Sequence, residues 1–371
     1  MGEVANIPQL RFPEFRNEWE ESKVGKVFKV SAGGDIKTEN VSQIKTDGFP
    51  YPIYANAEKA KGLYGYSNLY KSEANVVTVA GRGVNIGIAH VRLEPFYPIV
   101  RLLVLNPIKD ADVKFWENQL NQLNLFVEST GVPQLTAPQI SSYKVKYPSK
   151  PEQQKIAAFL TAVDNKIEQL SKKQELLGEY KKGLMQQIFS QAIRFKADDG
   201  SEFPDWEEKK LRDVAKITTG SSNREDSGLD GQYTFFDRSE DIRTSDRYLF
   251  DGKAVIVAGE GSRFPPKYFE GKFDLHQRTY AIMEFVEANS KYIFYFVDKQ
   301  KNYLLRYAVG STVKSLRLPI FQKMPVSLPS LPEQTKIANF LSSIDNKIEQ
   351  VGGQLDKSKQ FKKALLQQMF V

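Results

Sequence analysis

Two stretches of the chain decide its fold: PEQQKIAAFLTAVDNKIEQL at residues 151–170 and PEQTKIANFLSSIDNKIEQV at residues 332–351. They are identical at 14 of 20 positions, at an offset of 181 residues. The agreement resumes at the same offset, where KKGLMQQIF at 181–189 matches KKALLQQMF at 362–370. Because chance does not produce such agreement, the sequence contains an internal repeat, and the fold has to be interpreted in two copies.

Each repeated stretch predicts a long helix. Its Pro and Glu suit a first helical turn and the positive end of the helix dipole, and Ser149 and Ser330 are candidate caps. Apolar residues then recur every seven positions, beginning at Ile156 and Val163 in the first copy. A helix of about 38 residues would be roughly 57 Å long at about 1.5 Å per residue.

A seven-residue apolar repeat is typical of helix-on-helix packing. Since both helices carry the same stripe, we expect them to pair as an antiparallel coiled coil. In the alternative, each helix packs only on its own neighbouring domain. The residues predicted to pack the helix pair are Ile156, Phe159, Leu160, Val163, Ile167, Leu170, Leu177, Leu184, Ile337, Phe340, Leu341, Ile344, Ile348, Val351, Leu355 and Leu365.

The segments 1–150 and 195–331, which precede the two helices, are a weaker repeat of each other. Trp19-Glu20-Glu21 corresponds to Trp206-Glu207-Glu208, and VVTVAGRG at 76–83 corresponds to VIVAGEG at 255–261. Short runs rich in Val, Ile and Tyr predict strands, and amphipathic stretches at 112–129 and 289–306 predict helices. The expected class is α+β, with two α/β domains of mixed or antiparallel sheet and a pseudo-twofold repeat.

Composition excludes several classes of protein. The chain has 371 residues, no cysteine and two histidines, which excludes a disulfide scaffold, a thiolate zinc site and a cysteine nucleophile. No stretch approaches 18 consecutive apolar residues, so no transmembrane helix is expected. Residues 1–11 lack the apolar core of a signal peptide, and we therefore expect a cytoplasmic protein.

The formal net charge of +7 favours a polyanionic partner such as DNA. The charge is nevertheless spread along the chain, and residues 195–331 contain 21 basic and 21 acidic residues. Any DNA-binding surface must therefore be assembled by folding.

Polar residues in the predicted loops are the candidates for contact with DNA. Arginine suits guanine edges and phosphates, and asparagine suits adenine. For each residue taken alone, a solvated side chain or a local salt bridge is the competing interpretation. Arg101 and Arg278 occupy matching places in the two copies, which favours a shared structural or phosphate-binding role for them. The candidates are Lys37, Asn56, Arg82, Asn85, Arg101, Ser222, Asn223, Arg224, Arg238, Arg243, Arg263, Arg278 and Lys314.

No motif in the sequence predicts catalysis or a metal site. The Gly-x-Gly at 81–83 lacks the following helix pattern and the distant acidic residue of a dinucleotide site. A phosphate-binding loop of the motor NTPase type is missing, and Pro204-Asp205 lacks the spacing of a metal-dependent nuclease site. His90 and His276 occupy different places in the two copies, which favours structural roles for both.

With these features, the chain resembles the DNA specificity subunit of type I restriction-modification enzymes. The resemblance rests on RFPEFRNEWEESKVGKV at 11–27, EFPDWEEKKLRDV at 202–214 and the two PEQ helices. It implies two target recognition domains, at 1–150 and 195–331, each reading one half of an asymmetric bipartite DNA site. It also implies that the helices at 151–194 and 332–371 pair to set the spacer and to dock partner subunits.

The same resemblance implies a non-catalytic subunit that leaves the chemistry to its partners. Two modification (methyltransferase) subunits would bring S-adenosylmethionine and adenine methylation, and restriction (translocase/nuclease) subunits would bring Mg- and ATP-dependent cleavage. An alternative from another class is a structural adaptor whose two repeated domains bind proteins or glycans.

Overall fold

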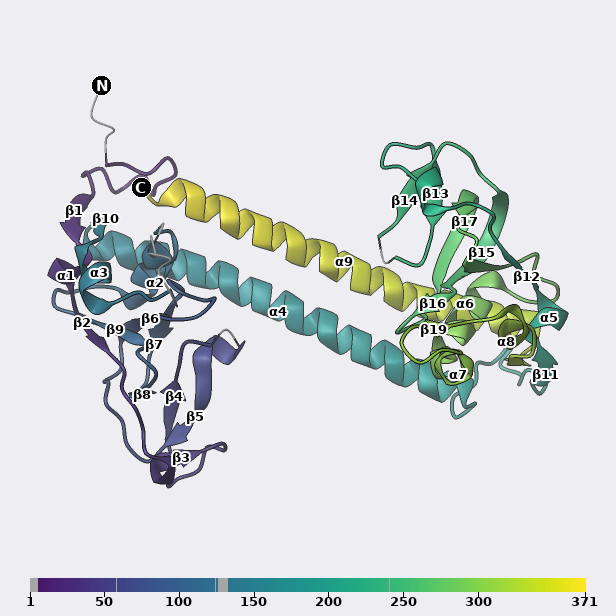
Figure 1. Cartoon of the computed structure of the whole chain (residues 1–371), viewed down its shortest axis with the longest axis horizontal. Helices are drawn as coiled ribbons and strands as arrows, with labels where there is room; N and C mark the ends of the chain where they lie inside the picture. The colour runs from purple at the N-terminus through teal and green to yellow at the C-terminus, as the bar shows by residue number, and fades with distance from the viewer. Residues whose placement is uncertain (1–5, 58, 124, 126–132, 240) are drawn as a thin grey trace. The chain divides into compact units, whose positions relative to one another are not determined.

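The computed structural model describes residues 6–57, 59–123, 125, 133–239 and 241–371. Two long helices, α4 (Lys150–Phe189) and α9 (Leu331–Met369), follow the two sheet-rich segments (Figure 1). The chain forms two compact units. Unit 1 comprises the described residues up to 171 together with 354–371, and unit 2 comprises the described residues between 172 and 353. Each unit therefore contains one end of each long helix.

In both units the long helices pack antiparallel. In unit 1, Leu160 near the start of α4 shares a buried cluster with Leu365 near the end of α9. In unit 2, Leu341 near the start of α9 shares a cluster with Ile188 near the end of α4. An ion pair crosses the helices in each unit, with Lys362 Nζ 2.6 Å from Asp164 Oδ1 in unit 1 and Lys181 Nζ 2.5 Å from Asp345 Oδ1 in unit 2. The predicted antiparallel pair is confirmed, and a helix that packs only on its own domain is excluded.

Unit 1 contains two four-stranded sheets, ordered β2-β9-β6-β7 and β3-β5-β4-β8, and a two-stranded ribbon of β1 and β10. Its strands are β1 (Glu20–Lys23), β2 (Phe28–Ala32), β3 (Val41–Ser42), β4 (Tyr51–Tyr54), β5 (Leu63–Ser67), β6 (Val76–Val79), β7 (Ala89–Arg92), β8 (Tyr97–Pro98), β9 (Leu103–Pro107) and β10 (Lys144–Tyr147). Its shorter helices are α1 (Val24–Val27), α2 (Val113–Asn121) and α3 (Ala137–Ser142). Residues 124 and 126–129, which belong to the helix predicted at 112–129, lie outside the described residues.

Unit 2 contains one six-stranded sheet, ordered β12-β18-β15-β17-β13-β14, and the two-stranded ribbons β11-β20 and β16-β19. Its strands are β11 (Glu207–Lys210), β12 (Lys216–Thr219), β13 (Tyr233–Phe236), β14 (Arg243–Ser245), β15 (Phe250–Ala258), β16 (Glu260–Gly261), β17 (Lys267–Leu275), β18 (Thr279–Met283), β19 (Lys314–Ser315) and β20 (Pro325–Leu328). Its shorter helices are α5 (Leu211–Val214), α6 (Ser290–Lys299), α7 (Lys301–Tyr307) and α8 (Leu318–Gln322).

The two units share one plan, and the main difference between their sheets lies in one strand. The order β2-β9-β6 in unit 1 matches β12-β18-β15 in unit 2. The nine-residue β17 pairs with β15 along its length and also with β13, so it joins the whole sheet. In unit 1 the equivalent strand is interrupted between β7 and β8, where Pro95 stands. Proline cannot donate to a strand ladder, which accounts for two smaller sheets in unit 1.

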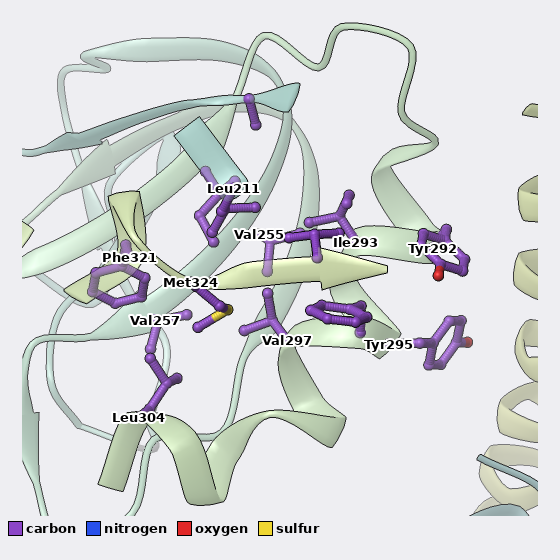
Figure 2. Packing of buried hydrophobic residues seen from close by; sticks show 14 of the residues in the cluster. Leu211, Val255, Val257, Tyr292, Ile293, Tyr295, Val297, Leu304, Phe321 and Met324 are labelled. Atoms are coloured by element: carbon purple, nitrogen blue, oxygen red, sulfur yellow. The ribbon is translucent and has the colours of Figure 1, made fainter. Parts of the chain in front are cut away.

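The core of unit 2 lies between its sheet, α6 and the long helices. Figure 2 shows Val255 of β15 beside Ile293 and Val297 of α6, and Val257 of the same strand beside Leu304 of α7, all of them completely buried. Tyr295 extends from α6 to the first half of α9, where its hydroxyl donates to Asp345 Oδ2 at 2.6 Å. Burial raises the pKa of Tyr295 far above its usual value, so the phenol stays protonated and can donate this bond. The sheet domain is thereby fixed to the helix that follows it.

Candidate nucleic-acid interface

The first turn of α4 carries a buried ion pair. The Glu152 side chain is only 2% exposed, and Arg11 binds it with two hydrogen bonds, Nε to Oε1 at 2.7 Å and Nη2 to Oε2 at 2.8 Å. Trp19 Nε1 donates to the same carboxylate at 3.4 Å. The hydrogen bonds that Arg11 donates to Glu152 raise the pKa of Arg11, so the guanidinium stays charged.

Unit 2 repeats this arrangement at the first turn of α9. Arg194 donates to Glu333 through Nη2 at 2.9 Å and through Nε at 3.3 Å, and Trp206 Nε1 donates to Oε2 at 3.2 Å. The Glu333 side chain is fully buried, and its hydrogen bond raises the pKa of Arg194. The sequence predicted only a favourable dipole interaction for these glutamates, because their arginine partners lie 141 and 139 residues earlier in the chain.

The glutamine of each PEQ triplet connects the long helix to the preceding short helix. Gln153 Oε1 accepts from the backbone N–H of Asp112, the residue that caps α2. Gln334 Oε1 likewise accepts from the N–H of Asn289, which caps α6. We call the four residues of each unit, Arg11, Trp19, Glu152 and Gln153 or Arg194, Trp206, Glu333 and Gln334, the helix-start anchor. It fixes each long helix to its sheet domain and explains why PEQ occurs in both copies.

The residues predicted to pack the helix pair differ in burial. Phe159 lies at the edge, 36% exposed, with its ring perpendicular to that of Phe12. Val163, Ile167, Leu177, Leu184, Phe340 and Ile348 are half-buried. The buried members are Ile156, Leu160, Leu170, Ile337, Leu341, Ile344, Val351, Leu355 and Leu365.

In unit 1, three of the DNA-contact candidates come together from separate strand ends. Asn56 follows β4 and connects two loops, because its Nδ2 donates to the Val100 carbonyl at 2.5 Å and its Oδ1 accepts from Gly81 N at 2.8 Å. Arg82 is half-buried and donates to Gln134 Oε1 at 3.1 Å. Arg101 is exposed, with its backbone in the left-handed region at φ +57°.

Unit 2 places Arg238, Glu260 and Arg278 at the same three positions. Arg238 follows β13 by two residues, as Asn56 follows β4, and both strands pair in parallel with their neighbours. Arg82 pairs with Gln134 in an antiparallel bridge, and Glu260 pairs with Ser315 in the same way. We call these three positions of each unit the loop cluster.

Two glycines support this equivalence. Gly81 and Gly259 precede Arg82 and Glu260, and their carbonyls accept from the backbone N–H groups of Leu135 and Leu316. A Cβ at Gly81 would lie 2.9 Å from the Arg101 carbonyl oxygen, and one at Gly259 would lie 2.3 Å from the Arg278 carbonyl oxygen. Glycine is required at both positions because the backbones approach so closely.

The loop cluster of unit 2 borders a small hollow. Glu260, whose side chain is 17% exposed, binds Arg278 Nη1 at 2.8 Å and Arg238 Nη1 at 3.3 Å. A hollow of about 210 Å³ is lined by Arg224, Asp237, Arg238, His276, Gln277 and Arg278. Partial burial, together with the nearby arginine charges, lowers the pKa of His276, so its imidazole is neutral at pH 7.

The remaining candidates lie in varied surroundings. Ser222 is fully buried and donates to Asp274, so it belongs to the interior. Asn223 accepts from Gln277 Nε2 at 2.6 Å beside the hollow. Arg263 lines a second hollow together with Arg238, and Lys314 lies on β19, which pairs with β16. Lys37 is exposed, Asn85 is half-buried in the 81–88 loop, and Arg243 is half-buried on β14.

The sequence did not single out Glu260, Gln277 or a contact role for His276. Glu260 had one signal, since its Gly-Glu-Gly stands where the first copy has Gly-Arg-Gly. Within the described residues, no cluster of three or more histidine or acidic side chains could hold a metal ion. Nor does that part of the chain contain a helix with the length and apolar character needed to cross a bilayer.

Comparison with known proteins gives consistent matches. The family model described as type I restriction modification DNA specificity domain matches residues 16–177 and again residues 204–357. The EcoDI specificity subunit of Escherichia coli is 31% identical over 166 residues, which cover 44% of this chain and 37% of that protein. The MjaVIII specificity subunit of Methanocaldococcus jannaschii is 27% identical over 285 residues, which cover 68% of this chain and 67% of that protein.

Some of these relatives are matched over less than half of their length. A putative type I specificity subunit of Mycoplasma pneumoniae is 30% identical over 152 residues, 41% of this chain and 45% of that protein.

The fold is also that of a solved protein. The S subunit of a type I restriction-modification system from M. genitalium superposes with a TM-score of 0.71, covering 98% of this chain and 99% of that chain at 15% identity.

Proposed function

Because the chain belongs to the family of type I restriction modification DNA specificity domains, we propose that it is the non-catalytic specificity subunit of a type I complex. The observation that carries the proposal is the pair of loop clusters. Three strand ends meet at the same place in both units, yet two of the three side chains there differ: Asn56 and Arg82 in unit 1 stand where Arg238 and Glu260 stand in unit 2, whereas Arg101 and Arg278 match. A shared scaffold with different polar loops suits two unlike half-sites.

We propose that each unit reads one half of an asymmetric bipartite DNA site. Exposed arginines supply the donors that base edges and phosphates accept, and a neutral imidazole and amides lie next to them in unit 2. The balanced charge of residues 195–331 means that the loop surface, rather than overall charge, makes the contact.

The long helices are proposed to set the spacer between the half-sites. Both helices continue through both units without interruption, and their pairing is fixed by the buried stripe. Their outer faces, which are rich in Lys and Gln and repeated in both copies, would dock two modification (methyltransferase) subunits and, through them, restriction (translocase/nuclease) subunits. S-adenosylmethionine, ATP and Mg²⁺ would bind to those partners, and we propose the cytoplasm as the location.

The test is DNA binding by the full chain purified with its modification subunits. We expect one split sequence to be bound at least about 10³-fold more tightly than random DNA, with an affinity that falls steeply as salt rises. Binding that ignores DNA sequence and salt would instead favour the adaptor for proteins or glycans. Mapping methylated adenines in host DNA would then identify the sequence.

A domain exchange tests the assignment of half-sites. If residues 1–150 are replaced by the corresponding domain of a relative, one half of the recognised sequence should change and the other half should stay the same. A change in both halves would contradict the division of labour between the two units.

A further inference from the structure

Glu260 places a carboxylate in the middle of a surface that is otherwise arginine-rich. Its side chain is 17% exposed, whereas those of Arg238 and Arg278 are 57% and 60% exposed. One carboxylate therefore holds two guanidinium groups that still face solvent. A negative charge at this place weakens the attraction for a phosphate, which depends mainly on net positive charge.

Arg278 is restrained at its backbone as well as at its side chain. Its carbonyl accepts from Gly259 N at 2.8 Å, and its own N–H donates to His276 Nδ1 at 3.1 Å. With Nη1 bound to Glu260, the guanidinium group is restrained at one end as well. A donor fork that is already oriented loses little conformational entropy when it binds a rigid acceptor pair.

The hydrogen bonds that the structure gives to the Arg278 guanidinium, among the described residues, use Nη1 alone. Nε and Nη2 remain to form a two-pronged donor edge beside the hollow that His276 and Gln277 also line. Guanine is the base that presents two acceptors, O6 and N7, on its major-groove edge, and it matches such a fork.

We propose that Arg278 reads a guanine in the half-site bound by unit 2 and that Glu260 is its positioning residue. This inference rests on the proposed function and adds a base and two residues to it. Unit 1 has no equivalent arginine–carboxylate pair, because Arg82 occupies the position that Glu260 has in unit 2. No carboxylate among the described residues forms an ion pair with Arg101. The guanine is therefore assigned to one half of the site only.

The experiment is selection from a DNA library in which both half-sites are randomised, using the full chain with its modification subunits. Arg278→Lys keeps the charge and removes the fork, Glu260→Gln keeps the shape and removes the charge, and Arg212→Lys on α5 is the matched control. The wild type should enrich guanine at one position of one half. Arg278→Lys should reduce that preference by about tenfold or more, and Glu260→Gln by about threefold to tenfold.

The readout separates a positioning role of Glu260 from a merely structural one. A positioning role changes the preference at one base and leaves the base preferences at the other positions of the same half-site unchanged. Two results would overturn the inference. One is an equal loss of affinity for all sequences with a smaller salt slope, which marks Arg278 as a phosphate contact. The other is a guanine preference that both variants retain. A wild type without any sequence preference would overturn the proposed function as well.

Discussion

At the helix start, units 1 and 2 hold the same four residue types in the same hydrogen bonds, Arg, Trp, Glu and Gln. At the loop cluster, the same backbone frame carries different residue types at two of its three positions, and arginine at the third in both units. The helix-start anchor is buried and supports the fold of each unit, whereas the loop cluster is largely exposed. The two copies therefore agree at the helix-start anchor, which holds each sheet domain to its long helix. They differ at the loop cluster, which is available for recognition.

The largest effect is expected from the buried contacts of the helix pair. Leu160→Ala and Leu341→Ala remove equivalent, fully buried side chains from the two units. Each should lower the free energy of unfolding by about 2–5 kcal/mol, because the lost burial is compounded by a cavity. Urea unfolding followed by far-UV circular dichroism measures this loss.

Leu176→Ala is the matched control, since Leu176 lies on α4 and is 50% exposed. It should change the stability little. If the losses in free energy of unfolding for Leu160→Ala and Leu341→Ala differed strongly, the two helix starts would not be equivalent. That result would contradict the comparison of the two units.

The helix-start anchor should show the next largest effect. Glu333→Ala removes the buried carboxylate that accepts from the Arg194 guanidinium and from Trp206 Nε1. We expect a loss of about 2–3 kcal/mol, below the range for a fully buried pair because Arg194 keeps two backbone acceptors and is partly exposed. Glu152→Ala should cost about the same in unit 1.

Fluorescence distinguishes the two units, because Trp19 and Trp116 belong to unit 1 and Trp206 to unit 2. Glu349→Ala on the exposed face of α9 is the control and should be nearly silent. Equal losses for Glu333→Ala and Glu349→Ala would show that the buried ion pair contributes nothing.

The helix pair and the helix-start anchor also differ in how far the sequence predicts them. The helices and their antiparallel pairing follow from a seven-residue period that recurs in both copies. The family resemblance follows from the two PEQ helices together with the segments 11–27 and 202–214, and all three predictions are confirmed. The burial of Glu152 could not be predicted, because its partner Arg11 is brought to it only by the folded domain.

The loop cluster was predicted in part. The chemistry of five side chains suits contact with DNA, and the fold brings them together from three strand ends in each unit: Asn56, Arg82, Arg101, Arg238 and Arg278. The same chemistry predicts contact for Ser222, which is buried, because a polar residue in a loop carries no signal of its depth. Glu260 is not predictable in this way, because an isolated acidic residue in the sequence suggests no DNA contact. The domain limits, the base contacts and the partners' cofactors stay predictions.

A smaller effect on stability is expected at the loop clusters, and it should differ between the two units. Asn56→Ala removes two hydrogen bonds that connect loops of unit 1 and leaves Gly81 N unpaired in the interior. Its stability should fall by about 1–2 kcal/mol. Arg238→Ala, at the equivalent place in unit 2, should leave stability nearly unchanged and weaken DNA binding, since this side chain is 57% exposed and its ion pair is with Glu260 at 3.3 Å.

Urea unfolding and DNA titration at several salt concentrations measure both quantities for each variant. A stability loss from Arg238→Ala as large as that from Asn56→Ala would contradict the distinction between a structural tie in unit 1 and a contact residue in unit 2.

The smallest effect concerns pH and is confined to unit 2. Burial lowers the pKa of His276 below the value of about 6.5 that it has in the unfolded chain. Between these two values the unfolded state binds more protons than the folded state, so the free energy of unfolding falls as pH drops below about 6.5. Above that pH the imidazole is neutral in both states and contributes no pH dependence. His276→Asn keeps an acceptor for the Arg278 N–H and removes the titration, so its stability should decline less than that of the wild type between pH 6.5 and 5. Parallel stability curves for the two proteins over this range would show that His276 is not shielded from protonation, and the hollow beside Arg278 would then carry an additional positive charge in acid.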